Sequence, residues 1–242
     1  MRDPFQPRQV TSRRGGPAKK PLSQEAIVDV ALALLAREGL EGMSLRRVAA
    51  ELKTGAASLY AYVEGLEELQ ALVCDRGLGA VKTTGGAKRA WRERLVELLR
   101  SYLLVLLRTP GLAQLAMRTI AVGPNALRII EALLALLAEG GVDRGTAAWA
   151  TDLLTLHVTA IAAEQSERRK QSRPLAPVAR VMATISQDRY PGIFAARAAM
   201  LDGGSRRLAW SLEVLVAGVL KTPRAPEAKR ATGNKRKEQA GG

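Results

Sequence analysis

The stretch from Ser44 to Val63 constrains the fold more than any other part of the chain. It contains two helical patterns joined by a glycine turn, Lys53-Thr54-Gly55. Ser44 is placed to cap the first helix. The apolar residues of that helix recur at i, i+3, i+4 and i+7 and are Leu45, Val48, Ala49 and Leu52. The second helix is expected to run for about two turns, from Ala56 to Tyr62, with Leu59 facing inward.

The remaining chain also predicts helices. Hydrophobic residues make up 47% of the sequence and are mostly Ala, Leu and Val, a composition that favours helix over strand. A helix capped by Ser23 and closed by Gly39 precedes the opening stretch, and longer helices separated by Gly and Pro continue to Leu220. No segment alternates as a strand would. We therefore expect an all-α protein with a three-helix N-terminal helix-turn-helix unit.

Positive charge is concentrated at the two ends of the chain. The formal net charge is +14, and residues 1–22 and 221–242 each carry +5, whereas residues 23–81 carry −4. Both ends lack hydrophobic periodicity, so we expect a disordered basic arm at 1–22 and a disordered basic tail at 221–242. Such segments either follow DNA phosphates or only solubilise the protein, and the sequence leaves both possibilities open.

Several classes of site and location are disfavoured by the residue content. Cys74 is the only cysteine, which excludes an intrachain disulfide and a cysteine-based zinc site. The longest apolar run, Leu95 to Leu107, is too short and too charged to span a bilayer. With no signal-peptide pattern, we expect a cytoplasmic protein without a membrane partner. The sequence contains no glycine-rich phosphate loop, metal-ligand cluster or Cys/His pair, so we expect no metal, no cofactor and no enzymatic activity.

Residues Leu22 to Leu78 resemble the DNA-binding domain of the tetracycline-repressor (TetR) family. The resemblance is carried by AIVDVALALLAREGLEGMSLRRVAAEL, the glycine turn, the Ser58-Leu59-Tyr60 core and Val63. GPNALRIIEALLALLAEGG resembles the branch whose C-terminal domain is like that of the tetracycline repressor. The resemblance implies a DNA-binding domain over 23–81, and a helical-bundle ligand-binding and dimerisation domain over 82–220. It also implies that the third helix lies in the major groove of a palindromic operator, and that a small molecule releases the DNA.

The resemblance places DNA contacts at the start of the second helix and on the outer face of the third. These positions are Ser44, Leu45, Arg46, Ala56, Ala57, Ser58, Tyr60, Ala61 and Tyr62. Physically, Ser44 and Arg46 suit a phosphate, and the alanines permit close approach to base edges. The tyrosine hydroxyls reach phosphates, although Tyr60 could instead pack between the two helices.

The chain departs from the family where the fourth helix begins. The family usually has a lysine there, whereas this chain reads Glu64, Gly65, Leu66, Glu67. The third helix also lacks an Arg, Lys, Gln or Asn able to make a bidentate base contact. Either the basic ends supply the missing phosphate contacts, or DNA affinity is weak or specialised.

A mainly apolar ligand is expected among the C-terminal helices. Candidate contacts are the polar or bulky residues on apolar faces: Trp91, Tyr102, Met117, Arg118, Asn125, Trp149 and His157. Three of these residues also have a purely structural alternative: His157 could pack at a subunit contact, Trp149 could belong to the core, and Asn125 could cap a helix. The expected dimer contact is a four-helix bundle from 143–163 and 205–220 of each subunit. Its seam would be the stripe Leu208, Leu212, Leu215 and Val219.

These features together predict a ligand-responsive homodimeric transcriptional repressor that binds a palindromic double-stranded DNA operator. The first alternative is an all-α module that binds a small molecule or a protein and has weak or vestigial DNA binding. The second alternative, an all-α enzyme, lacks any acid/base or metal cluster to support it.

Overall fold

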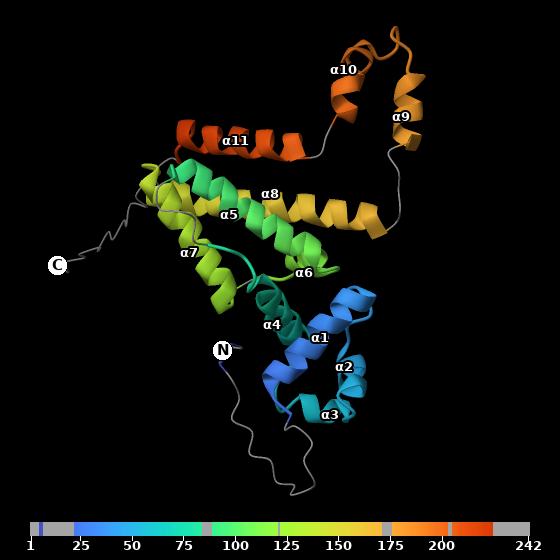
Figure 1. The fold of residues 1–242 in the computed structure, drawn as a ribbon, viewed down its shortest axis with the longest axis vertical. Coiled ribbons are helices and arrows are strands. Elements are labelled where there is room, and N and C mark those ends of the chain that lie inside the picture. Colours follow the sequence, from blue (N-terminus) through green and yellow to red (C-terminus); the bar gives the residue numbers. More distant parts are fainter. Residues whose placement is uncertain are drawn as a thin grey trace, which may run out of the picture.

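The computed structural model describes residues 5–6, 22–83, 89–120, 122–170, 176–202 and 205–224. Every regular element in these ranges is a helix, as the composition predicted (Figure 1). The helices are α1 (Gln24–Glu38), α2 (Leu45–Glu51), α3 (Ala56–Leu59), α4 (Leu66–Leu78), α5 (Trp91–Arg108), α6 (Leu112–Arg118), α7 (Pro124–Glu139), α8 (Arg144–Lys170), α9 (Ala176–Ala183), α10 (Pro191–Leu201) and α11 (Ser205–Lys221). No helix in the described part of the chain is long and apolar enough to cross a lipid bilayer.

The helix starts follow from local capping. The Ser23 hydroxyl accepts a hydrogen bond from the Ala26 amide at 3.1 Å, and the Ser44 hydroxyl accepts one from the Arg47 amide at 3.3 Å. Each bond satisfies an amide that has no partner within its helix. The Asp143 carboxylate caps α8 in the same way, accepting from the Thr146 and Gly145 amides. The hydrogen bond from the Thr146 side chain, followed by those from the two amides, lowers the pKa of that carboxyl.

Helices α1 to α4 form the head of the molecule. α1 packs on α4, and α2 packs on α3. Of the inward positions expected from the sequence, Val48, Ala49 and Leu59 are buried, whereas Leu45 and Leu52 are half-buried. α3 is shorter than predicted: it ends at Leu59 instead of Tyr62. The Leu59 carbonyl accepts from both the Tyr62 and Val63 amides, at 2.8 and 3.0 Å, so the chain tightens into a turn.

The body is built around α8, against which α5, α6 and α7 pack. α4 also contacts α5, α6 and α7, so it belongs to both the head and the body. The same buried apolar cluster continues from α1 to α11. α2 and α3 lie at one end of the molecule and α11 at the other, while α9 and α10 project from the body (Figure 1).

The apolar stripe of α11 serves a different purpose from the one expected. Leu212 is completely buried (0% exposed) because it packs within the subunit, as does Val216, which is 3% exposed. The prediction that Leu212 forms part of a seam between subunits is therefore wrong. The apolar side chains that α11 leaves exposed are Trp210 and Val214.

The ends of the chain are partly ordered. α11 reaches Lys221, and the Arg224 amide then donates to the Thr146 hydroxyl at 2.7 Å. At the other end, Phe5 packs half-buried against the core beside Gly123. The rest of the expected disordered segments, residues 1–4, 7–21 and 225–242, lies outside the described residues.

Candidate nucleic-acid interface and ligand pocket

The α2–α3 surface brings the predicted DNA-contacting residues together at one end of the molecule (Figure 1). Their exposure divides them into two groups. The side chains of Arg46, Ala57, Ser58, Tyr60 and Ala61 are exposed, and those of Ser44, Leu45, Ala56 and Tyr62 are half-buried. The exposed group combines one cation, two hydroxyls and two methyls, which suits phosphate contact and close approach to base edges.

The two tyrosines of this surface differ in environment. Tyr60 is 54% exposed, whereas Tyr62 is half-buried and packs against the core. The Tyr62 carbonyl also accepts from the Gln24 side-chain amide at 3.3 Å, which ties the turn to α1. The sequence left open whether the Tyr60 ring packs between the two helices. In the structure the partly packed ring is that of Tyr62, which follows the turn at Leu59.

An ion-pair network fixes α2 against α1. The Arg47 guanidinium bonds Glu38 at 2.5 Å, and Arg37 bonds both Glu38 and Glu51. The hydrogen bond that Arg37 donates to Glu51 is the main cause that raises the Arg37 pKa, and the bond that Glu38 accepts from Arg37 is the main cause that lowers the Glu38 pKa. The network neutralises Arg47, whereas Arg46 forms no ion pair with any described residue.

The start of α4 is acidic in place of the family's lysine. Glu67 and Glu68 lie in the first turn of α4, where carboxylates suit the positive end of the helix dipole. The Glu68 carboxylate also accepts a hydrogen bond from the Glu64 amide. This arrangement stabilises the helix start, and residues 64–68 themselves offer no cation to a phosphate.

A cavity of about 510 Å³ lies within the body between α4, α5, α6, α7 and α8. Its lining is Leu78, Tyr102, Ala116, Met117, Thr119, Ile120, Val122, Ala126, Ile129, Ile130, Asp152, Thr155, Leu156 and Thr159. Most of these side chains are apolar, and the lining carries a single carboxylate. Such a cavity fits a mainly apolar molecule that has a few polar groups.

The polar groups of this cavity form a short chain between α5 and α8. The Thr159 hydroxyl donates to the Thr155 carbonyl at 2.7 Å, so it accepts from the Tyr102 hydroxyl at 2.8 Å. Burial is the main cause that raises the Tyr102 pKa, which keeps the phenol protonated. The phenol oxygen retains lone pairs that can accept from a ligand.

The structure places two of the seven predicted ligand residues, Tyr102 and Met117, in this cavity. Arg118 lines a neighbouring cavity beside the end of α1. The other four lie elsewhere. Trp91 packs against Gly140, and the Trp149 ring lies 4.7 Å from the Arg224 guanidinium.

Asn125 and His157 each have a structural partner outside the cavity. The Asn125 amide donates to Asp75 at 2.9 Å. His157 Nε2 lies 2.8 Å from the Ser211 hydroxyl of α11. Because that hydroxyl already donates to the Leu208 carbonyl at 2.9 Å, His157 is the donor and carries its proton on Nε2.

Sequence reasoning missed several lining residues, among them Ile129, Ile130, Thr155 and Thr159. A signal was present, because Thr151, Thr155 and Thr159 recur every four residues on one face of an otherwise apolar helix.

A buried carboxylate, also missed from the sequence, joins the head to the cavity wall. Asp75 of α4 is 4% exposed and accepts from the Ala126 amide and the Asn125 side chain, both at 2.9 Å. It thereby holds the N-terminus of α7, whose residues Ala126 and Ile129 line the cavity. α4 is also closely packed on α6, since Gly77 has no room for a Cβ against Leu112.

No group of three or more His, Cys, Asp or Glu side chains within the described ranges could hold a metal ion. The Cys74 thiol is buried, and burial, with a smaller contribution from Asp75, raises its pKa to about 12. It is therefore protonated and inert at neutral pH.

Comparison with known proteins agrees with this arrangement. Residues 27–69 match the family model "Bacterial regulatory proteins, tetR family", and residues 84–222 match "Tetracyclin repressor-like, C-terminal domain". The curated HTH-type transcriptional repressor DrrR1 of Streptomyces coeruleorubidus is 37% identical over 134 residues, which are 54% of this chain and 50% of DrrR1. The chain spans about half the length of the curated relatives it matches.

Solved structures give longer matches. ActR of Streptomyces coelicolor in complex with actinorhodin is 36% identical, with a TM-score of 0.76 over 84% of this chain and 97% of ActR. ActR in complex with (S)-DNPA is 35% identical, with a TM-score of 0.77 over 84% of this chain and 99% of ActR. Both halves of the fold and their sequences therefore agree, and this chain belongs to the tetR family of bacterial transcription regulators.

Proposed function

We propose that the chain is a homodimeric, ligand-responsive transcriptional repressor that binds a palindromic operator through α2 and α3. The observation that carries the proposal is the division of the α2–α3 surface. Its outer side exposes Arg46, Ser58 and Tyr60, while its inner side is buried against α1. In this proposal residues 23–81 are the DNA-binding domain, and residues 82–220 bind the ligand and the second subunit.

Each predicted contact residue of the α2–α3 surface has a proposed part in operator binding. Arg46 and Tyr60 contact phosphates, and Ser44 and Leu45 place the helix start against the backbone. Ala57, Ser58 and Ala61 approach the base edges, where a methyl can pack on thymine. Ala56 and Tyr62 are half-buried, so they set the spacing of this surface and reach DNA only at its edge.

The basic ends of the chain supply phosphate contacts that the head lacks. Residues 23–81 carry a net charge of −4, whereas residues 1–22 carry +5. Deleting residues 1–21 should weaken operator binding and reduce the slope of log affinity against log salt, because fewer counterions are released. An unchanged slope would exclude a role for the arm.

The effector site is the cavity between α4 and α8. Its apolar lining and the Tyr102–Thr159 hydroxyl pair suit a molecule with an apolar body and a few polar groups. Actinorhodin and (S)-DNPA, which occupy the solved ActR complexes, are the first compounds to test. Met117 and Tyr102 are the proposed contacts from α6 and α5.

Ligand binding reaches the head through α4. The cavity walls are joined to that helix by the Asp75–Ala126 hydrogen bond and by the close Gly77–Leu112 contact. A ligand that fits the cavity better in one position of α6 and α7 than in another shifts the position of α4, and with it the reading head.

The dimer surface is formed by the apolar residues that α8 and α11 leave exposed. Trp149 and Leu153 lie one turn apart on α8, and Trp210 and Val214 lie one turn apart on α11. Large exposed apolar residues on two adjacent helices suit the four-helix contact of an isologous dimer. The paired substitution Leu153→Glu/Val214→Glu should yield a monomer in sedimentation velocity, and a dimer that persists would exclude this surface.

A gel-shift titration with DNA from upstream of the neighbouring divergent gene tests the whole proposal. We expect a shift that prefers this DNA over a scrambled sequence of equal length and that is reversed by the effector. The acidic head favours a second candidate, an all-α binding module with vestigial DNA binding. The absence of a sequence preference at low salt, with the basic ends present, would select that candidate.

A further inference from the structure

A second groove, separate from the proposed effector cavity, lies between α5 and the end of α4. Its volume is about 490 Å³. One wall is the outer face of α5, and the other is the chain from Gly77 to Thr83. Lys82 is fixed beside α5, because its amide donates to the Ser101 hydroxyl at 2.9 Å. This groove shares no lining residue with the effector cavity.

The lining of this groove is strongly cationic. It contains Lys82, Arg94, Arg100 and Arg108, but only one carboxylate, Glu97. Glu97 is already paired with Arg89. Within the described ranges, Lys82, Arg100 and Arg108 form no ion pair, so three cations face one small groove without counter-charge.

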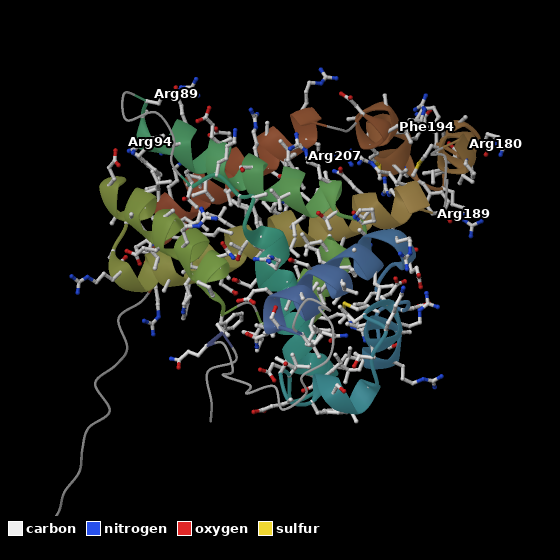
Figure 2. The ribbon with its side chains drawn as sticks, turned by 60° about the horizontal axis from the view of Figure 1, so that its bottom comes forward. Arg89, Arg94, Arg180, Arg189, Phe194 and Arg207 are labelled. Atoms are coloured by element: carbon white, nitrogen blue, oxygen red, sulfur yellow. The ribbon has the colours of Figure 1, made fainter. Side chains whose placement is uncertain are left out.

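Arg94 adds a donor without an acceptor. Its terminal nitrogen pairs with Glu139 of α7, yet its Nε is buried and has no hydrogen-bond partner among the described residues. Arg89 lies just before α5 and Arg94 in its first turn, at the edge of the body remote from α3 (Figures 1 and 2). Buried guanidinium donors normally find an acceptor, so this Nε is an unsatisfied donor in the wall of the groove.

Apolar residues form the floor between these charges. Leu98 and Val105 are nearly buried, and Leu104, which also lines the groove, is 49% exposed. Gly77 and Ala80 line the opposite wall. Cations alone would suit an inorganic ion, but cations around an exposed leucine suit a molecule with an apolar body and an acidic group.

We propose that this groove is a second ligand site that binds an amphipathic organic anion, with its acidic group held by Arg100, Arg108 and Lys82. Its apolar body lies on Leu104. Because Gly77 lies in the last turn of α4 and Ala80 follows that helix, occupancy also changes the support of the helix that joins the head to the body. The site does not depend on operator binding and can be tested without DNA.

The test uses two fluorescent probes with the same aromatic body. Anilinonaphthalene sulfonate carries an acidic group, and phenylnaphthylamine does not. Both are titrated into the full-length protein, into Arg100→Gln/Arg108→Gln, and into the control Arg144→Gln/Arg169→Gln. The control removes the same charge from exposed residues that do not line the groove.

We expect the groove variant to bind the sulfonate about fivefold more weakly, since two charge contacts to the acidic group are lost. Its affinity for the neutral probe, and both affinities of the control, should stay within twofold. Leu104→Glu should weaken sulfonate binding in the same way. Equal sulfonate binding by wild type and the groove variant would overturn the proposal, as would an equal loss in the control. Loss of operator binding without loss of sulfonate binding would assign these arginines to DNA and overturn it also.

Discussion

Replacing Asp75 by alanine should destabilise the protein more than any exposed substitution in the head. The Asp75 carboxylate is 4% exposed and holds the first turn of α7 through the Ala126 amide and the Asn125 side chain. Alanine removes both bonds and leaves the Ala126 amide, in a residue that is 3% exposed, without an acceptor.

The expected cost follows from these contacts. A hydrogen bond to a charged group contributes about 1.5–3 kcal/mol, and an unsatisfied buried amide costs about 1–3 kcal/mol. Part of this loss is offset because a buried charge is removed as well. We therefore expect the free energy of unfolding to fall by about 3 kcal/mol, which lowers Tm by roughly 6–12 °C in a chain of this size.

Thermal unfolding followed by circular dichroism measures this effect. Asp75→Asn keeps an oxygen for the Ala126 amide, but it loses the charge and places an NH2 group where Asn125 needs an acceptor, so it should cost about 1–2 kcal/mol, less than Asp75→Ala. Asp29→Ala is the matched control, because Asp29 is an exposed residue of α1 paired with Arg76 at 2.7 Å. Such a surface pair contributes at most about 1 kcal/mol. A loss below 1 kcal/mol for Asp75→Ala, or an equal loss for Asp29→Ala, would refute the reasoning.

Three further substitutions or treatments test other parts of the structure. Tyr60→Ala should weaken operator binding by roughly tenfold at constant Tm, whereas Tyr62→Ala should lower Tm because its ring packs on the core; a gel shift and a melting curve separate the two. Gly111→Ala should cost about 2–4 kcal/mol in urea unfolding, since φ is 81° and the new Cβ would lie 2.7 Å from a side chain of α1. Gly141 has a φ of 78° but open space around it, so Gly141→Ala should cost only about 1 kcal/mol. Equal losses for Gly111→Ala and Gly141→Ala would show that the close contact at Gly111 is unimportant. The Cys74 thiol should resist a thiol reagent at pH 8 until urea unfolds the chain, and rapid labelling of the native protein would contradict its burial. Because folding raises the Cys74 pKa from 9.0 to about 12, the free energy of unfolding should also fall as the pH increases across that interval.

Local features of the sequence predicted the helices well and their contacts less well. Ser23 and Ser44 cap α1 and α2 as predicted, because capping involves residues only three apart. The end of α3 was placed three residues too late, since helical periodicity carries no signal for the double hydrogen bond to the Leu59 carbonyl.

The interior of the body shows where sequence reasoning stopped. The Tyr102–Thr159 bond joins residues 57 apart, and the Asp75–Ala126 bond joins residues 51 apart. Polarity on an apolar face correctly marked Tyr102 as unusual. It could not distinguish a residue in the cavity from His157, which faces α11, because both have the same local pattern.

In the proposed function, one protein binds DNA with α2–α3 and loses that binding when the cavity is filled. Fluorescence anisotropy of a labelled upstream DNA, titrated with protein at fixed salt with and without actinorhodin, measures both properties. We predict saturable, sequence-preferring binding whose Kd rises at least tenfold with the ligand, and a smaller rise in Thr155→Trp, which narrows the cavity. Binding that shows no sequence preference at low salt would contradict it.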